Sequence, residues 1–232
     1  TITALTPLFT TEDSITGTSS FYNDISRISS RWETTNDIIW TPDITICMWL
    51  KITNENANSY ATVFHSLTSP YVVKYHTGTA GNTNAGVVLN GNGTTFYSTD
   101  SNVFKADSKW HFHVLRGKKN AGNTINVNLY IDNILIETWV DKPFNDTPQK
   151  IEVMGYHETR SVVTTIDGIS SKGMGIIGKM DDFRIYNRAL TPEEIGTIYN
   201  CSTNYKAFNN NKSLVGWVGE TPTIHFDTAY PG

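Results

Sequence analysis

The chain has 232 residues, of which 38% are hydrophobic, 12% aromatic and 17% charged, and its formal net charge is −4. This length fits one β-sandwich domain, and the aromatic content is enough to build a core, which excludes a chain that is disordered throughout. The mildly acidic balance argues against a nucleic-acid partner, and the sequence predicts no membrane insertion because it has no long apolar run.

Alternating side chains predict a strand at residues 43–52, DITICMWLKI. Ile44, Ile46, Met48 and Leu50 occupy every second position, so they share one face and turn it toward a core. Similar short runs, rich in β-branched and aromatic residues and separated by Gly and Asn, follow along the chain. They predict further strands at 61–67, 70–76, 94–99, 110–118, 150–156 and 175–187.

Residues 125–140 predict a β-hairpin, because two strand-like runs flank the pair Asp132 and Asn133. Both residue types tolerate the left-handed backbone that a two-residue turn requires. Residues 110–118 precede this hairpin and predict a strand that ends in a glycine-bearing turn.

Residues 190–200, LTPEEIGTIYN, predict a short helix near the carboxyl end. Thr191 is the expected N-cap, and Glu194, three residues later, completes a capping box. At helical spacing one face is apolar, and this face is expected to pack on the sandwich. Its members are Ile195, Ile198 and Tyr199.

The two cysteines, Cys47 and Cys201, leave two arrangements open. A disulfide between them would close a long loop and stabilise an extracellular sandwich. Alternatively they are separate thiols, and the one in the predicted strand is a small buried apolar residue. The sequence gives no distance between them and does not decide.

Several segments resemble the laminin-G-like jelly-roll domains of the concanavalin A-like lectin/glucanase superfamily. The strongest is GKMDDFRIYNRALTPEEIGTIYN at 178–200, which is similar to the closing strand and helix of that family. Residues 110–138 and 43–52 are similar to its Trp-His strand with hairpin and to its Thr-Ile-Ser-Ala-Trp strand. Residues 32–40 look like the strand before. The family's hairpin usually has Asp-Gly where this chain has Asp132 and Asn133.

The resemblance implies an all-β fold, a two-sheet antiparallel β-sandwich (jelly roll) with one short C-terminal helix. The sandwich is expected over residues 1–200. Residues 201–232 are expected to form a C-terminal extension that packs on the same sandwich or closes it.

Many members of the superfamily resemble one another in holding Ca²⁺ at the rim, where loop carboxylates and carbonyls supply oxygen ligands. The matching acidic positions here are Asp37, Asp181 and Asp182, which we take as candidate calcium ligands. The alternative for each carboxylate is ordinary turn capping.

Two histidines, His111 and His113, share one face of the predicted strand at 110–118. Histidines at this spacing can ligate zinc. Because no third ligand accompanies them in the sequence, a packed or exposed pair is the favoured interpretation.

Candidate sugar-binding residues lie in two loops. Residues 155–161, GYHETRS, contain Tyr156, His157 and Arg160, and residues 77–84, TGTAGNTN, contain Asn82 and Asn84. Aromatic rings stack on sugar faces, whereas amides and charged groups bond the hydroxyls.

The sequence predicts a non-catalytic, surface-exposed module outside the cell or on a virion that binds carbohydrate or protein. Glycan hydrolysis needs two carboxylates flanking the bond, and the alternating Glu-x-Asp-x-Glu strand of the glucanases is absent from the sequence. A structural subunit of a virion, fibre or surface appendage is the alternative, and a homo-oligomer is compatible with either function. An unusual glycan hydrolase is the second alternative.

Overall fold

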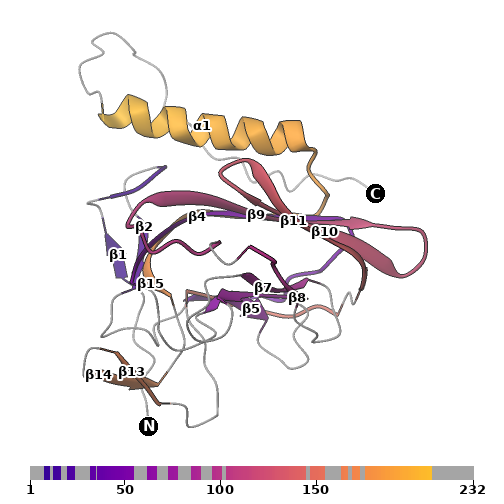
Figure 1. Ribbon diagram of the computed structural model, residues 1–232, viewed down its shortest axis with the longest axis horizontal. Helices are drawn as coiled ribbons and strands as arrows, with labels where there is room; N and C mark the ends of the chain where they lie inside the picture. Colours follow the sequence, from indigo (N-terminus) through magenta and orange to yellow (C-terminus); the bar gives the residue numbers. More distant parts are fainter. Residues whose placement is uncertain are drawn as a thin grey trace.

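Two antiparallel sheets stack face to face, and one helix covers the outer side of the larger sheet (Figure 1). This is the two-sheet antiparallel jelly-roll β-sandwich expected from the sequence. The computed structural model describes residues 8–10, 13–16, 20–23, 32–34, 36–54, 62–66, 73–77, 85–89, 96–100, 103–144, 147–154, 163–166, 169–172 and 176–210.

The larger sheet has seven strands, and its order shows that strands distant in sequence lie side by side. In spatial order they are β1 (Leu8–Thr10), β2 (Ser20–Asn23), β15 (Ile177–Tyr186), β4 (Ile44–Asn54), β9 (Trp110–Lys119), β10 (Thr124–Ile131) and β11 (Ile134–Pro143).

The smaller sheet has six strands, and a separate two-stranded ribbon accompanies it. In spatial order the six are β3 (Trp32–Glu33), β12 (Ile151–Val153), β5 (Thr62–Ser66), β6 (Val73–Thr77), β7 (Ala85–Leu89) and β8 (Phe96–Tyr97). The ribbon is β13 (Val163–Ile166) with β14 (Ile169–Lys172).

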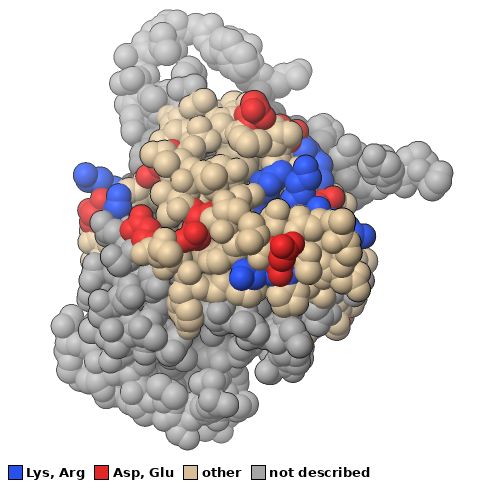
Figure 2. All heavy atoms as spheres, turned by 45° about the vertical axis from the view of Figure 1, so that its right-hand side comes forward, with Lys and Arg blue, Asp and Glu red and all other residues tan. Residues whose placement is uncertain are grey.

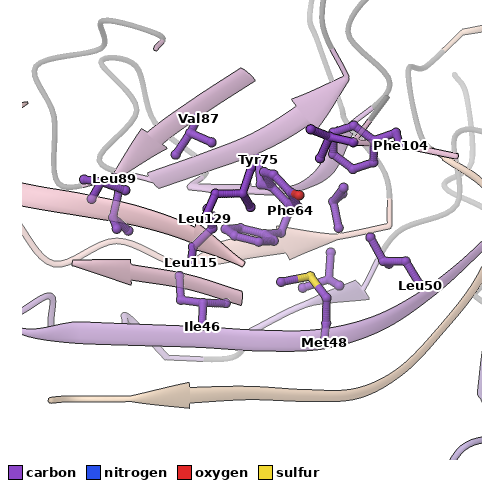
Figure 3. Close-up of a cluster of buried hydrophobic side chains, with 14 of the residues drawn as sticks. Ile46, Met48, Leu50, Phe64, Tyr75, Val87, Leu89, Phe104, Leu115 and Leu129 are labelled. Carbon is purple, nitrogen blue, oxygen red and sulfur yellow. The ribbon is translucent and has the colours of Figure 1, made fainter. Parts of the chain in front are cut away.

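The main core lies between the two sheets (Figure 3). On the side of the larger sheet, the core consists of the predicted apolar face of β4 and of neighbouring side chains from β9 and β10. Aromatic and aliphatic side chains of the smaller sheet pack against them. The labelled residues include Ile46, Met48, Leu50, Leu115 and Leu129 of the larger sheet and Phe64, Tyr75 and Val87 of the smaller sheet. Burying this apolar surface is the dominant favourable term in folding.

A second apolar layer lies on the outer side of the larger sheet, beneath the helix α1 (Pro192–Asn210). The opposite face of β4 therefore is also buried, and Trp49 stacks on Tyr199 of α1 with ring centroids 5.6 Å apart. Ile195, Ile198 and Tyr199 pack on this layer, as the helical spacing predicts.

Both cysteines are free, which decides the alternatives that the sequence left open. Cys47 is buried in the layer under α1, and burial raises its pKa to about 12. Cys201 lies exposed on α1. The two thiols are therefore separate, and Cys47 serves as a small apolar residue.

The predicted capping box forms at the start of α1. The backbone N–H of Glu194 donates to Oγ1 of Thr191, and the Glu194 carboxylate accepts the backbone N–H of Thr191 at 2.8 Å. Arg188 also donates to that carboxylate. The helix continues ten residues beyond the predicted end at 200, so the expected boundary between sandwich and extension falls inside α1. Within the described residues, α1 has no apolar stretch long enough to cross a membrane.

The predicted hairpin joins β10 to β11, and its turn residues have the left-handed φ values expected of a type I′ turn, 51° for Asp132 and 65° for Asn133. Strand β11 lies at the edge of the larger sheet and carries two register irregularities against β10. Such bulges protect an edge strand from pairing with another chain.

Candidate functional site

Asp181 lies in an irregularity of β15, where its register against β4 shifts. Its carboxylate accepts the backbone N–H groups of Ile15 (2.6 Å), Thr16 (2.9 Å) and Asp182 (2.7 Å). Burial raises the pKa of Asp181, and the three N–H donors oppose that shift. The carboxylate thus fastens the segment 13–16 to the outer side of the larger sheet.

Asp182 follows in the left-handed conformation, with φ 52°. One carboxylate oxygen accepts the Nε–H of Arg184 at 2.5 Å, and the other accepts the hydroxyl of Ser202 on α1 at 3.4 Å. The Ser202 hydroxyl also donates to Ile198 O within α1 at 3.0 Å, so its contact with Asp182 is the longer of the two.

Asp37 is exposed and precedes Ile38, which forms an isolated bridge with Gln149. The structure does not gather Asp37 with Asp181 and Asp182: the part of the chain that it describes holds no group of three or more His, Cys, Asp or Glu residues suited to a metal ion. Asp181 and Asp182 bond to protein donors as the capping alternative requires. Calcium binding by the three residues stays a prediction.

The two histidines of β9 have different environments. His113 is buried in the core, where its Nδ1 and the hydroxyl of Tyr75 share a hydrogen bond of 2.7 Å. Burial lowers the pKa of His113 to about 3, so its ring is neutral. This is a packed histidine, as the favoured interpretation of the sequence has it.

His111 lies at the rim between two carboxylates. Its Nδ1 is 2.6 Å from Asp132 Oδ2, and its Nε2 is 3.2 Å from Asp107 Oδ1. Only the protonated ring can donate from both nitrogens at once. The hydrogen bond to Asp132 raises the pKa of His111 accordingly. The sequence showed the pair of histidines, but not that Asp107 and Asp132 would flank one of them.

A buried pair of ionisable side chains joins two neighbouring strands of the smaller sheet. His65 on β5 faces Glu152 on β12 in the strand register, and His65 Nε2 lies 2.9 Å from Glu152 Oε2. Their side chains are 2% and 0% exposed. One carboxylate sealed from solvent does not supply the two flanking carboxyl groups that glycoside hydrolysis uses.

All five predicted ligand-binding residues lie outside the described residues: Tyr156, His157, Arg160, Asn82 and Asn84. The structure does describe Met154, at the end of β12, directly before the predicted loop 155–161. Met154 has a left-handed backbone, with φ 62°, although it is neither glycine nor asparagine. Its side chain is buried in the core, and its N–H donates to Val63 O at 2.6 Å.

An outward polar surface on β9, β10 and β11 was not predicted. The side chains of Asn126 and Asn128 project from β10 away from the core, because they alternate with Ile125, Val127 and Leu129. They bond to neighbours on β9, on β11 and in the β9–β10 turn. The signal available in the sequence was the alternation INVNL at 125–129, which was interpreted only as a strand.

Charges are mixed on the face of the molecule shown in Figure 2. Lysine and arginine side chains lie among acidic ones, and broad uncharged areas separate them. A single-sign field that would steer a polyanion or a polycation is not visible on that face.

Comparison with solved structures finds the same fold at low sequence identity. A heptameric SAP-like pentraxin from Limulus polyphemus matches with a TM-score of 0.56 and 14% identity over 80% of this chain and 82% of that one. The receptor-binding domain of botulinum neurotoxin type G matches with a TM-score of 0.55 and 15% identity. The match covers 84% of this chain and 44% of the toxin chain, so this chain spans less than half of the toxin structure's length.

The binding domain of botulinum neurotoxin serotype D gives a TM-score of 0.52 at 15% identity, over 79% of this chain and 42% of that one. At these identities the likeness is one of fold. No curated protein sequence matches the chain. A laminin G family model of the concanavalin A-like lectin/glucanases superfamily matches residues 29–196, which is most of the chain. The chain therefore belongs to the concanavalin A-like lectin/glucanases superfamily.

Proposed function

We propose that this protein is a non-catalytic module that binds carbohydrate on a surface outside the cell or on a virion. The observation that carries the proposal is the strained exit of β12 at Met154. A left-handed backbone at a non-glycine residue costs on the order of 1 kcal/mol or more, and such strain is concentrated at functional sites.

The strain at Met154 gives the following loop a defined start. The buried side chain of Met154 and its hydrogen bond to Val63 fix the position of the last described residue before the loop. Residues 155–161, with Tyr156, His157 and Arg160, come next in the sequence. A rigid sandwich that presents short polar and aromatic loops is a common basis for sugar recognition. Asn82 and Asn84 are proposed to contribute from the second loop.

Calcium is part of this proposal, with Asp37, Asp181 and Asp182 as candidate ligands that the structure does not bring together in one group. Superfamily membership supports this, together with the preference of Ca²⁺ for carboxylate oxygens. Removal of the ion by EDTA is then expected to weaken sugar binding and leave the sandwich folded.

A glycan array tests the proposal. The wild-type protein is expected to bind a restricted set of the immobilised glycans. The Tyr156→Ala variant is expected not to bind them, because it lacks the aromatic ring that stacks on the sugar. Tyr22→Phe is the control, because Tyr22 lies on β2 of the larger sheet, whereas both loops adjoin strands of the smaller sheet. If the wild-type protein binds no glycan on the array, or if it hydrolyses a polysaccharide, the proposal is overturned.

The second candidate function is that of a structural subunit which assembles through protein contacts. The exposed aliphatic side chains of β11 favour it: Ile134 is 64% exposed, Leu135 50% and Val140 58%. Light scattering over a range of concentrations tests it. A concentration-dependent oligomer that Leu135→Lys abolishes, with a flat glycan array, would favour assembly over sugar binding.

A further inference from the structure

We infer a saccharide-binding surface on the outward side of β9, β10 and β11, which takes a neutral sugar through a vicinal diol and is formed by other residues than the loops at 77–84 and 155–161. The inference deepens the proposed function and rests on it for the class of ligand. The atoms that carry it belong to Asn120, Asn126 and Asp141, with Asn128 and Thr138 beside them.

The strand register places these residues in two adjacent rows. In one row Arg116 on β9 pairs with Asn128 on β10, which pairs with Thr138 on β11. Their side chains form a continuous chain of hydrogen bonds, from Arg116 Nη1 to Asn128 Oδ1 (2.9 Å) and from Asn128 Nδ2 to Thr138 Oγ1 (2.9 Å). The row is therefore ordered before any ligand arrives.

The second row is joined by Asn120. Its Nδ2 donates both to Asn126 Oδ1 at 2.7 Å and to Asp141 Oδ1 at 2.8 Å. The ends of Asn126 and Asp141 therefore meet at the same nitrogen atom and lie next to each other. Asp141 has a left-handed backbone, with φ 51°, in an irregular part of β11, and it is exposed.

These bonds fix which atoms remain for a ligand. The backbone N–H of Asp141 donates to Asn126 Oδ1 at 3.1 Å, and an N–H can only donate. The oxygen of the Asn126 amide therefore faces the protein, and the NH₂ group of the same amide can donate to a ligand. Asp141 uses Oδ1 for Asn120 and Thr124, which leaves Oδ2. Within the part of the chain that the structure describes, neither Asn126 Nδ2 nor Asp141 Oδ2 has a protein partner.

A donor and an acceptor held side by side match a vicinal diol, because each hydroxyl can donate or accept. One hydroxyl would donate to Asp141 Oδ2, and its neighbour would accept from Asn126 Nδ2. Val140, which is 58% exposed, offers an apolar contact beside them for the C–H face of a sugar ring. Since the side chains are already ordered, binding would not pay for fixing them.

The charges of the surface favour a neutral ligand. At the diol position Asp141 would repel an acidic group, whereas Lys118, which pairs with Asn126 across the strands, would repel a cation.

Affinity electrophoresis tests the inference with the full chain in gels containing amylopectin, galactomannan, arabinoxylan or mixed-linkage β-glucan, with hyaluronan as an acidic polysaccharide. Two nearly isosteric variants probe the site. Asp141→Asn keeps a residue that tolerates the left-handed backbone and removes the charged acceptor. Asn126→Asp keeps the oxygen that accepts the Asp141 N–H and removes the donor. Asp100→Asn, the loss of another exposed carboxylate, is the charge-matched control for Asp141→Asn.

We expect the wild type to be retarded by at least one neutral polysaccharide. Asp141→Asn should weaken that affinity about tenfold or more, since a hydrogen bond to a charged group is lost. Asn126→Asp should weaken it about as much, because the donor is lost and a second carboxylate stands beside Asp141. Asp100→Asn should bind this polysaccharide as the wild type does. Circular dichroism melting curves confirm that all variants are folded.

If Tyr156→Ala abolishes binding whereas Asp141→Asn and Asn126→Asp leave it intact, the strand surface is not the binding site. The inference is then overturned, and the proposed function is kept. Retardation by hyaluronan alone would overturn the neutral class of ligand. A wild-type protein that no saccharide retards, in the gels or on the array, would overturn the proposed function and this inference together.

Discussion

The hydroxyl of Tyr75 and Nδ1 of His113 share a hydrogen bond of 2.7 Å in the centre of the sandwich. Tyr75 belongs to β6 of the smaller sheet and His113 to β9 of the larger one, so this bond joins the two layers. Phe104 stacks on the histidine ring with centroids 5.5 Å apart. A polar pair in an apolar core is tolerated because each group satisfies the other.

Tyr75→Phe is expected to destabilise the protein by about 1–3 kcal/mol, because His113 would keep a buried nitrogen without its partner. Urea unfolding measures the change. Tyr97→Phe, at a 40% exposed position, is the control and should change the stability by no more than about 0.5 kcal/mol. Equal effects of the two variants would show that the buried bond contributes nothing.

The pKa of His113 predicts a loss of stability in acid. The folded protein keeps this ring neutral down to a pKa of about 3, whereas the unfolded chain takes up a proton near 6.5. Stability that is present above pH 6.5 therefore falls as the pH drops toward 3. His113→Asn removes the titration and retains a polar atom near the Nδ1 position, so its unfolding free energy should depend less on pH over this range. An unchanged slope would contradict the assignment.

His111 predicts the opposite dependence. Its pKa is raised, foremost by the hydrogen bond to Asp132, so the protonated ring is favoured in the folded state. Its contribution is complete below the unfolded value of 6.5 and is lost as the pH rises through the folded pKa. In His111→Asn, which keeps a donor toward Asp132, this loss should disappear. NMR titration of the ring protons reads the pKa directly, and a value below 6.5 would refute the geometry.

Local features of the fold followed from the sequence because their causes are local. The capping box of Thr191 and Glu194, the turn at Asp132 and Asn133, and the alternation along β4 each depend on neighbours within a few residues. The burial of the second face of β4 did not follow, since it depends on where α1 docks. The length of α1 was also missed, because no sequence signal marks its end at Asn210.

The hydrogen-bond partners of the candidate site residues were predictable only where they are close in the sequence. The carboxylate of Asp181 bonds to the N–H of Ile15, 166 residues away, and β15 lies between β2 and β4. No spacing rule encodes such a contact, so the acidic pair was interpreted as a rim site by resemblance. The polar surface around Asn126 and Asp141 arises in the same way, from the register and irregularities of β10 and β11.

Asp181→Asn separates the structural role of this carboxylate from the proposed calcium role. With EDTA present, the variant is expected to lose about 1.5–3 kcal/mol of stability, because an amide nitrogen cannot accept backbone N–H bonds. If Asp181 also binds calcium, the loss should be larger in calcium than in EDTA. Denaturant unfolding in both buffers measures this, and an equal loss would contradict the calcium role of Asp181.

Gly196 on α1 and Asn133 at the hairpin tip are predicted to be coupled. A Cβ atom added at Gly196 would lie 3.2 Å from Asn133 Nδ2, which is close for a side-chain contact. Gly to Ala within a helix usually gains about 1 kcal/mol, but here the asparagine amide must move to make room. Gly196→Ala alone should therefore gain less than this amount.

In an Asn133→Gly background the same Gly196→Ala substitution should gain the full amount of about 1 kcal/mol, because glycine keeps the left-handed turn and removes the obstructing amide. A double-mutant cycle from urea unfolding measures the difference between the two backgrounds. Additive effects would mean that the hairpin tip does not restrain α1. A coupling of the expected sign would show why this chain keeps a glycine inside its helix opposite an asparagine at the turn.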